Sequence, residues 1–270
     1  MRARTPVRAG RSTLHAPARR GDVPRHHNVP RVRKPERQFV ELMLEAYRRG
    51  LFPMAEPGSQ DLAWYSPDPR AVVPIDRAPG EPGGVRVSRS LRSRLRARPF
   101  RVTTNAAFEE VIRACAEPRA RDPGGDDGSW IDERIIALYV MLHHAGRAHS
   151  VEAWLPALPG AEDGRPRLVG GLYGVHIGRA FFGESMFCRP ALGGTDASKV
   201  CLVHLVRHLR ARGFTLLDSQ FTSPHMASLG VIEIPRRTYL ARLRKAAEEH
   251  AEWGPWTGED GIEAAPGAPG

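Results

Sequence analysis

The order of secondary-structure signals along the 270-residue chain predicts an α+β fold, in which a small N-terminal domain precedes a larger mixed-sheet α/β domain. Two helical stretches occupy residues 105–146, and consecutive strand-like stretches follow over 148–188. Helix, strand and helix then alternate over 195–253. The 41% apolar content suffices for one substantial core, or for a core with a small appended domain.

The two ends of the chain lack apolar periodicity. Residues 1–37 are rich in Arg and Pro and nearly free of acid, so we predict a disordered basic arm. This arm could add non-specific RNA affinity. It is equally compatible with a translation start assigned too far upstream or with an organelle-targeting leader. We also predict a disordered tail over residues 254–270.

The predicted N-terminal domain spans residues 38–70. Apolar residues recur there at helical spacing, and Gly50 marks the end of the helix. Prolines divide the following stretch into turns and short strands. The apolar residues of the predicted helix face are Phe39, Leu42, Met43 and Ala46.

The predicted mixed-sheet domain spans residues 71–253 and opens with an amphipathic helix. Ser88 is a suitable N-cap and Pro99 ends the helix. Val87, Leu91 and Leu95 share one face, and only arginines lie on the opposite face. A stripe of one charge fits an anionic partner about as well as simple solvation. The stripe consists of Arg89, Arg92 and Arg96.

The remaining elements follow in chain order. Their boundaries are given by glycines and by changes between helical and alternating patterns. The glycines of "VGGLYG" indicate a strand that another backbone or a ligand approaches closely. We predict helices over 105–117, 131–146, 195–213 and 239–253, and strands over 148–155, 167–178, 179–188 and 214–221.

Charge and cysteine content limit the possible partners and location. A net charge of +10 and a pI near 10.3 favour a polyanion such as nucleic acid. No apolar run approaches the length of a bilayer span, and no apolar signal region follows the basic N-terminus. The three cysteines form no close pair, which favours buried reduced thiols in a cytoplasmic protein.

Two short segments carry polar residues inside apolar strands. In "LLDSQ", Asp218 and Gln220 fall on one strand face, together with Phe214 and Leu216, which indicates either a polar site or a strand end that reaches solvent. In "FFGESMFC", Glu184 needs a cationic or hydrogen-bonding partner, because a buried carboxylate is costly. An internal arginine and a cationic ligand both satisfy that need.

The histidines give only a weak metal signal. His204 and His208 have ligand spacing on a predicted helix, but the Glu of an H-E-x-x-H motif is missing. We therefore predict no metal site.

Several segments, in order over roughly residues 39–245, together resemble the leucyl/phenylalanyl-tRNA–protein transferases. They include "AYRRGLFPMAE", "WYSPDPRAVVP", "LVGGLYGV", "FFGESMF", "LLDSQF", "HMASLG" and "EIPRRTYL". The resemblance implies a GNAT-like larger domain and transfer of Leu or Phe, with Met as a third candidate, from aminoacyl-tRNA to proteins beginning with Lys or Arg. It also implies marking of those proteins for N-degron-dependent degradation, with the charged tRNA as donor and no metal or other cofactor.

The same resemblance implies residue roles. Asp218 and Gln220 match the catalytic pair, and Glu184 is our candidate for the acceptor's cation. Met54 stands where better-known members have a Trp used against the terminal adenosine, and a methionine can pack against a base there. The other candidate substrate-binding residues are Phe181, Leu172 and Met186 for the donor side chain, Trp130 near the donor and His225 in "HMASLG". The arginine stripe is the candidate tRNA-binding surface.

Three other functions remain alternatives. They are a related transferase that selects acidic N-termini, a GNAT-type N-acetyltransferase and a non-catalytic RNA-binding module. The second lacks a Q/R-x-x-G-x-G/A pyrophosphate loop, and the third leaves Glu184 and Asp218 unexplained. We expect a cytoplasmic monomer that binds neither DNA nor membrane.

Overall fold

The structure is a computed structural model that describes residues 34–56, 58–117, 129–159 and 164–257. Most of the predicted basic arm and of the predicted tail lies outside these residues. Two boundaries differ from prediction. Residues 34–37 form the first turn of a helix, and Trp256 packs against the ring of His208 at 4.8 Å.

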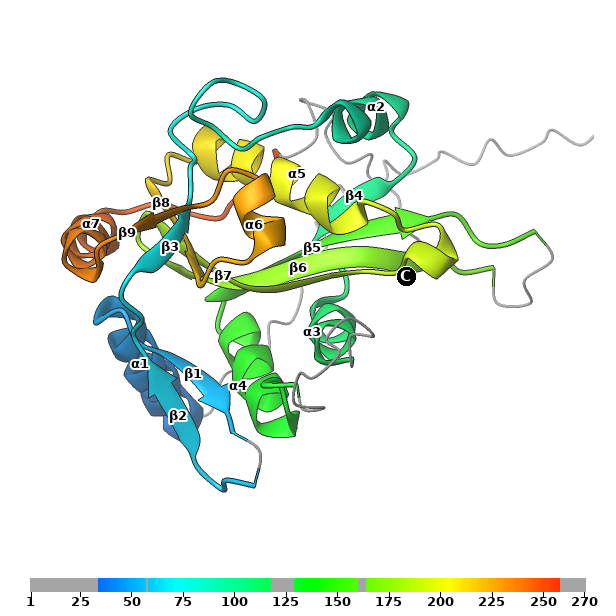
Figure 1. The fold of residues 1–270 in the computed structure, drawn as a ribbon. Helices are drawn as coiled ribbons and strands as arrows, with labels where there is room; N and C mark the ends of the chain where they lie inside the picture. The colour runs from blue at the N-terminus through cyan, green and yellow to red at the C-terminus, as the bar shows by residue number, and fades with distance from the viewer. Residues whose placement is uncertain (1–33, 57, 118–128, 160–163, 258–270) are drawn as a thin grey trace, which may run out of the picture. The chain divides into compact units, whose positions relative to one another are not determined.

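A seven-stranded mixed sheet forms the centre of the described chain, in the order β4-β5-β6-β7-β8-β3-β9 (Figure 1). β7 and β8 are parallel, and the other neighbours are antiparallel. The predicted α+β class with a mixed sheet is therefore confirmed. The strands are β3 (Arg70–Val73), β4 (Arg101–Thr104), β5 (Ala148–Leu155), β6 (Arg167–Ile177), β7 (Ala180–Cys188), β8 (Leu216–Gln220) and β9 (Ile232–Ile234).

Helices cover both faces of this sheet (Figure 1). One core lies between the sheet and the helices α1, α3, α4 and α7, and a second core lies on the opposite face under α2 and α5. Each predicted helix forms, but the last one begins at Arg236 and ends at Glu248 instead of spanning 239–253. The helices are α1 (Lys34–Arg48), α2 (Arg89–Ala97), α3 (Phe108–Ala116), α4 (Glu133–His144), α5 (Ala197–Ala211), α6 (Pro224–Ser228) and α7 (Arg236–Glu248), with a 3-10 turn at Pro190–Leu192.

The N-terminal segment contributes directly to the main sheet. After α1, the chain forms an antiparallel pair, β1 (Phe52–Ala55) with β2 (Leu62–Tyr65). It then enters the seven-stranded sheet as β3, between β8 and β9. The predicted domain boundary after residue 70 consequently falls within a strand.

The predicted buried face of α1 is partly wrong. Phe39 and Leu42 are 42% and 69% exposed. The buried stripe instead repeats at i, i+3, i+4 and i+7, which is the spacing of one helix face. Its members are Val40, Met43, Leu44 and Tyr47.

The glycines of β6 make room for neighbouring protein groups. A Cβ on Gly170 would lie 2.5 Å from the Cβ of Ala197 at the start of α5. A Cβ on Gly174 would lie 2.2 Å from the backbone oxygen of Phe182. Close packing inside the protein therefore explains these two glycines.

Two further observations concern cysteine and membranes. Cys115 and Cys201 are buried as predicted, whereas Cys188 is exposed, so the prediction of three buried thiols is wrong at that position. Within the described ranges, no helix combines the length and the hydropathy needed to cross a membrane.

Candidate active site

The polar end of β8 forms the centre of the site. Asp218 and Gln220 are buried on this strand and Ser219 is partly exposed, but the simple alternation predicted for the strand is interrupted after Asp218. On the neighbouring strand, Ala71 is opposite Gln220 and Val72 is opposite Asp218. Ser219 is therefore the extra residue of a β-bulge. Leu216 and Phe214 were both predicted to share the strand face of Asp218. Leu216 lies in the core under α1, α3, α4 and α7, whereas Phe214 lies in the core under α2 and α5.

Gln220 has an unusual conformation and an unused donor. Its φ of +55° is a left-handed value that a residue with a side chain rarely adopts. Its Nε2 atom is buried and has no hydrogen-bond partner among the described residues. Strained backbone and unsatisfied buried donors both concentrate at functional sites.

Asp218 is paired with Arg70, a residue that no sequence motif singles out. Arg70 Nε lies 2.9 Å from Asp218 Oδ1, and Arg70 Nη2 lies 2.5 Å from Oδ2. Both side chains are fully buried. Burial opposes the charge of Arg70, but the hydrogen bonds and charge of Asp218 outweigh it and raise the pKa of the guanidinium. The only sequence signal was an arginine at the start of an apolar strand.

Glu184 lies at a second bulge. On β6, Tyr173 is opposite Ser185 and Gly174 is opposite Gly183, so Glu184 is the extra residue of β7. Tyr47 donates a hydrogen bond from its hydroxyl to Glu184 Oε1 at 2.8 Å. The hydroxyls of Tyr47 and Tyr139 lie 2.6 Å apart. Among the described residues, these contacts are with tyrosines, and Glu184 forms no ion pair.

The surroundings of Glu184 favour its neutral form. Burial of the carboxyl group raises its pKa from 4.5 to about 8. The nearby charge of Asp218 acts in the same direction, whereas hydrogen bonds from Tyr47 and Tyr139 and the charge of Arg70 partly oppose it. A titrating carboxyl near neutral pH is a common property of functional sites.

Glu184 and Gln220 lie beyond the paired part of two parallel strands. The ladder between β7 and β8 runs from Ala180↔Leu216 to Phe182↔Asp218. Beyond it, β7 pairs with β6 and β8 pairs with β3. Ligands of α/β sheets commonly bind outside the carboxyl ends of such strands.

The three candidates for the donor side-chain pocket share the sheet face under α5. Leu172 lies directly opposite Met186 in the β6–β7 ladder. Met186 remains partly exposed, and Phe181 is fully buried. The ring of Phe181 stacks on Trp253 at 5.4 Å, so this residue also has a packing role.

Of the other candidate substrate-binding residues, Met54 and Trp130 lie in neighbouring parts of the fold. The backbone N–H of Ala55 donates to Trp130 O at 3.1 Å, which brings the neighbourhoods of Met54 and Trp130 together. Both side chains are partly buried against the same core. His225 is exposed on the short helix α6.

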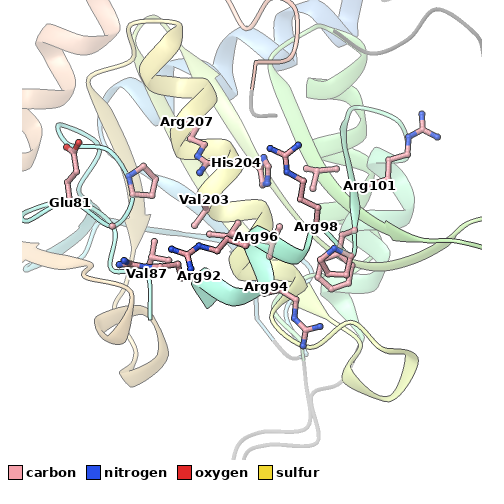
Figure 2. A pocket seen from close by; sticks show the side chains of 17 residues that line it. Glu81, Val87, Arg92, Arg94, Arg96, Arg98, Arg101, Val203, His204 and Arg207 are labelled. Carbon is pink, nitrogen blue, oxygen red and sulfur yellow. The ribbon is translucent and has the colours of Figure 1, made fainter. Parts of the chain in front are cut away.

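A basic cavity of about 770 Å³ lies between α2, β4 and α5 (Figure 2). Arg92 and Arg96 line it, whereas Arg89 is exposed but does not line it. Glu81 is the acidic member of the lining. Further basic lining side chains are Arg94, Arg98, Arg101, His204 and Arg207, and the apolar ones include Leu95, Phe100, Val200 and Val203.

The histidine pair on α5 does not converge. His204 lines the basic cavity, whereas His208 is buried and packs 4.4 Å from Trp253. Over the described part of the chain, no group of three or more His, Cys, Asp and Glu residues is arranged to hold a metal ion.

An apolar cluster, two bulged polar strand ends and a basic cavity lie on one mixed sheet. This combination fits a group-transfer enzyme of the α+β class that takes an apolar group from a polyanionic carrier. The family described as "Leucyl/phenylalanyl-tRNA protein transferase" matches residues 81–244, and its N-terminal domain matches residues 40–68. The chain belongs to this family and is an aminoacyltransferase.

Two relatives agree with this assignment, and a weak likeness to one solved structure adds no argument to it. Leucyl/phenylalanyl-tRNA–protein transferase of Azoarcus sp. is 47% identical over 83% of this chain and 84% of its own. The protein of the same name from Gloeobacter violaceus is 48% identical over 76% of this chain and 92% of its own. A tandem GNAT protein from the clavulanic acid biosynthesis pathway gives a TM-score of 0.31 at 13% identity, over 72% of this chain and 65% of that one.

Proposed function

We propose that this enzyme transfers Leu or Phe, with Met as a third candidate, from aminoacyl-tRNA to the N-terminal α-amine of proteins that begin with Lys or Arg. The new first residue then marks the protein for N-degron-dependent degradation. The relatives' names support the donor. The observation that carries the acceptor assignment is Glu184, a half-buried carboxyl group without an ion-pair partner among the described residues.

The chemistry requires correct placement of two substrates. The neutral α-amine attacks the carbonyl carbon of the aminoacyl ester, and the bond to the ribose oxygen breaks as the new C–N bond forms. The proton that the nitrogen loses ends on that ribose oxygen. An α-amine has a pKa of about 7.7–8.0, so a useful neutral fraction exists near pH 7.

Gln220 is our candidate for the group that holds the reacting atoms. An amide oxygen can accept a hydrogen bond from the attacking amine, and an amide nitrogen can donate one to the ester oxygen as negative charge develops there. The buried and unpaired Nε2 atom supports the second contact. Such a donor stabilises the transition state more than the ground state.

Glu184 is our candidate for recognition of the acceptor. A Lys or Arg side chain beside the α-amine would supply the ion-pair partner that Glu184 lacks among the described residues. Its arrival would favour the ionised carboxylate and lower the raised pKa. An acidic or neutral first residue would leave Glu184 protonated and without this attraction.

Leu172 and Met186 are our candidates for the floor that binds the donor side chain, with Phe181 packed behind them. A flexible methionine in an apolar pocket suits unbranched and γ-branched apolar side chains. Such a pocket discriminates weakly between residues that differ by one methylene group. The same argument keeps Leu, Phe and Met together as candidate donors.

The terminal adenosine of the tRNA is assigned to the neighbourhood of Trp130 and Met54. A tryptophan supplies a flat apolar face for a base, and a thioether packs favourably against an aromatic ring. The hydrogen bond between Ala55 and Trp130 supports a shared surface for the two side chains.

The basic cavity is our candidate for the tRNA backbone. Six arginines and His204 surround it, against Glu81 (Figure 2). Arginine contacts with phosphates give affinity that is insensitive to sequence and sensitive to salt. Arg92 and Arg96 line the cavity and Arg89 does not, which supports the first two as the tRNA contacts among the three predicted arginines.

The reaction as written needs no metal, nucleotide triphosphate or other cofactor, and we expect it in the cytoplasm. One experiment tests the proposal. The enzyme is mixed with labelled Leu-, Phe- or Met-tRNA and with peptides that begin with Arg, Lys, Glu or Ala, with and without EDTA. Parallel reactions contain labelled acetyl-CoA.

We expect labelled product with Leu- or Phe-tRNA and with Arg or Lys peptides, and no effect of EDTA. Transfer to Glu peptides alone would support selection of acidic N-termini instead. Transfer of acetyl groups alone would support an acetyltransferase. Binding of tRNA without any product would support an RNA-binding module.

A further inference from the structure

Arg70 links the N-terminal segment to the polar end of β8. It is the first residue of β3, and its guanidinium group donates to Gly50 O at 3.0 Å as well as to Asp218. The group lies 4.8 Å from the ring centre of Phe52 and 4.6 Å from that of Tyr239. Such cation–π contacts strengthen when water is excluded. The N-terminal segment, β8 and α7 therefore all contact the same buried guanidinium group.

The carboxylate of Asp218 is fully used by these neighbours. Oδ1 accepts from Arg70 Nε at 2.9 Å and from the backbone N–H of Gln220 at 3.0 Å. Oδ2 accepts from Arg70 Nη2 at 2.5 Å and from the Tyr239 hydroxyl at 2.8 Å. Four donors approach the capacity of a carboxylate, and the side chain has no exposed surface.

A group in this state is poorly placed to remove a proton from a substrate amine. A general base needs to reach that proton directly or through one water. Asp218 instead reaches the site through the Gln220 backbone, to which its Oδ1 is bonded. That bond holds the residue with the left-handed φ of +55° and the unpaired Nε2.

We propose that Arg70 is a positioning residue of the transfer reaction. It holds Asp218 so that Asp218 in turn fixes the backbone of Gln220, and Gln220 is the group that touches the substrates. Asp218 is then a support and not a proton acceptor. This inference rests on the proposed function, because it takes Gln220 as the group that touches the substrates. The contacts among Arg70, Asp218 and the Gln220 backbone do not depend on that function.

A double-mutant cycle of Arg70→Lys and Gln220→Ala tests the proposal. Lysine keeps the positive charge but cannot form the two-pronged contact with a carboxylate. A misplacement of about 1 Å in an active site costs on the order of 100-fold in rate. We expect Arg70→Lys alone to lower the single-turnover rate about 10- to 100-fold, with peptide KM and tRNA affinity changed less than about threefold.

The second half of the cycle separates positioning from independent action. If Arg70 acts through Gln220, Arg70→Lys costs less than about threefold once Gln220 is Ala. If Asp218 acts by its own route, the two losses multiply in the double variant, and the proposal is overturned. A folded Arg70→Lys enzyme with wild-type rate overturns it as well.

Two further variants keep the test decisive. Tyr239→Phe removes one donor to Asp218 but keeps the ring, and it replaces Arg70→Lys in the cycle if that variant fails to fold. Arg179→Lys is the matched control, because Arg179 pairs with Glu249 near the start of β8, away from Gln220. We expect its rate to stay within about twofold of wild type.

Hydrogen exchange provides a readout that needs no transfer activity. The backbone N–H of Gln220 bonds to Asp218, so its exchange should accelerate at least about tenfold in Arg70→Lys or Tyr239→Phe. Unchanged exchange in both variants contradicts the proposal. If the wild-type enzyme transferred no aminoacyl group, the proposed function would fail, and this measurement would still decide the role of Arg70.

Discussion

Replacement of Glu184 by Gln should change stability in a pH-dependent direction. Burial raises the pKa of Glu184 from 4.5 to about 8, so the folded protein retains a proton that the unfolded chain releases at lower pH. The stability contributed by the protonated group is present below about pH 4.5 and is lost as the pH rises to about 8. Gln resembles the protonated form at every pH. The variant should therefore match wild type at pH 5 and be more stable at pH 9.

The expected gain in stability follows from the pKa shift of Glu184 and from the exposure of its side chain. A pKa difference between 4.5 and about 8 corresponds to at most about 5 kcal/mol, at about 1.36 kcal/mol for each factor of ten. The side chain is only half-buried, so solvent screening reduces this figure, and we expect about 1–2 kcal/mol. For a chain of this size, that is an increase in Tm of about 2–8 °C at pH 9.

The same variant tests recognition of the acceptor. A charged hydrogen bond is worth about 1.5–3 kcal/mol, so loss of the carboxylate should lower kcat/KM for an Arg peptide by about 10- to 150-fold above pH 8. At pH 7 the free carboxyl is mostly protonated, and the loss should be about tenfold smaller. The ratio of wild-type to variant kcat/KM should thus rise with pH. This ratio cancels the titration of the peptide's own α-amine, which affects both enzymes equally.

Two results would refute this reasoning. A ratio that stays flat between pH 6 and pH 9 would mean that no ionisation of Glu184 accompanies acceptor binding. A variant that is destabilised by about 3–5 kcal/mol at every pH would mean that the side chain neutralises a buried cation. Thermal melts and steady-state kinetics on the same preparations distinguish the two results. Asp61→Asn, on an exposed turn, is a control for the loss of one negative charge.

Three other changes have definite expected outcomes. Asp218→Asn and Gln220→Ala should each lower the single-turnover rate on the order of 100-fold with tRNA affinity nearly intact, and wild-type rates in both would contradict their assignment. Joint replacement of Arg92, Arg94 and Arg96 by Gln should weaken tRNA binding and flatten its salt dependence in filter-binding assays. Arg89→Gln, outside the cavity, should have a smaller effect per residue, and equal effects per residue would argue against the cavity as the tRNA site. Gly174→Ala should destabilise the fold by about 1–3 kcal/mol, because the new Cβ would lie 2.2 Å from a backbone oxygen; an unchanged melt would show that the strands separate easily there.

Periodicity was sufficient to predict most of the elements. The helix over α2 was expected from Ser88 and Pro99, and its N-cap forms through the Ser88 hydroxyl and the N–H of Leu91. The strands β5, β6 and β7 were expected from their alternating and β-branched residues. Short elements such as β9 and α6 were not predicted, because a few residues give no measurable period.

The errors have physical causes. Phe39 and Leu42 are apolar at helical spacing, but α1 turns a different stripe, through Met43 and Tyr47, toward the core and leaves these two side chains exposed. The spacing of apolar residues along α1 fits two overlapping helix faces, and the spacing alone does not determine which face is buried. The bulges at Glu184 and Ser219 were also missed, because a bulge depends on the partner strand and on the register.

The role of Arg70 could not be predicted, since its contacts join residues 148 positions apart in the chain. A sequence with 40 Lys and Arg residues gives no reason to select one of them. What identifies Arg70 is complete burial together with a two-pronged contact to a carboxylate. Both properties belong to the tertiary structure.

The different surroundings of the two acidic residues explain why only one of them is paired with a cation in the part of the chain that the structure describes. Asp218 has no exposed surface, and an unpaired charge there would be very costly, so Arg70 must accompany it at all times. Glu184 is half-buried at a bulge beside two tyrosines, and it can avoid that cost by keeping its proton until a cation arrives. A permanent arginine partner at Glu184 would remove the site's attraction for a cationic acceptor. The proposed roles therefore agree with burial: the deeper carboxylate is bonded to the backbone of Gln220, and the shallower one has no ion-pair partner among the described residues.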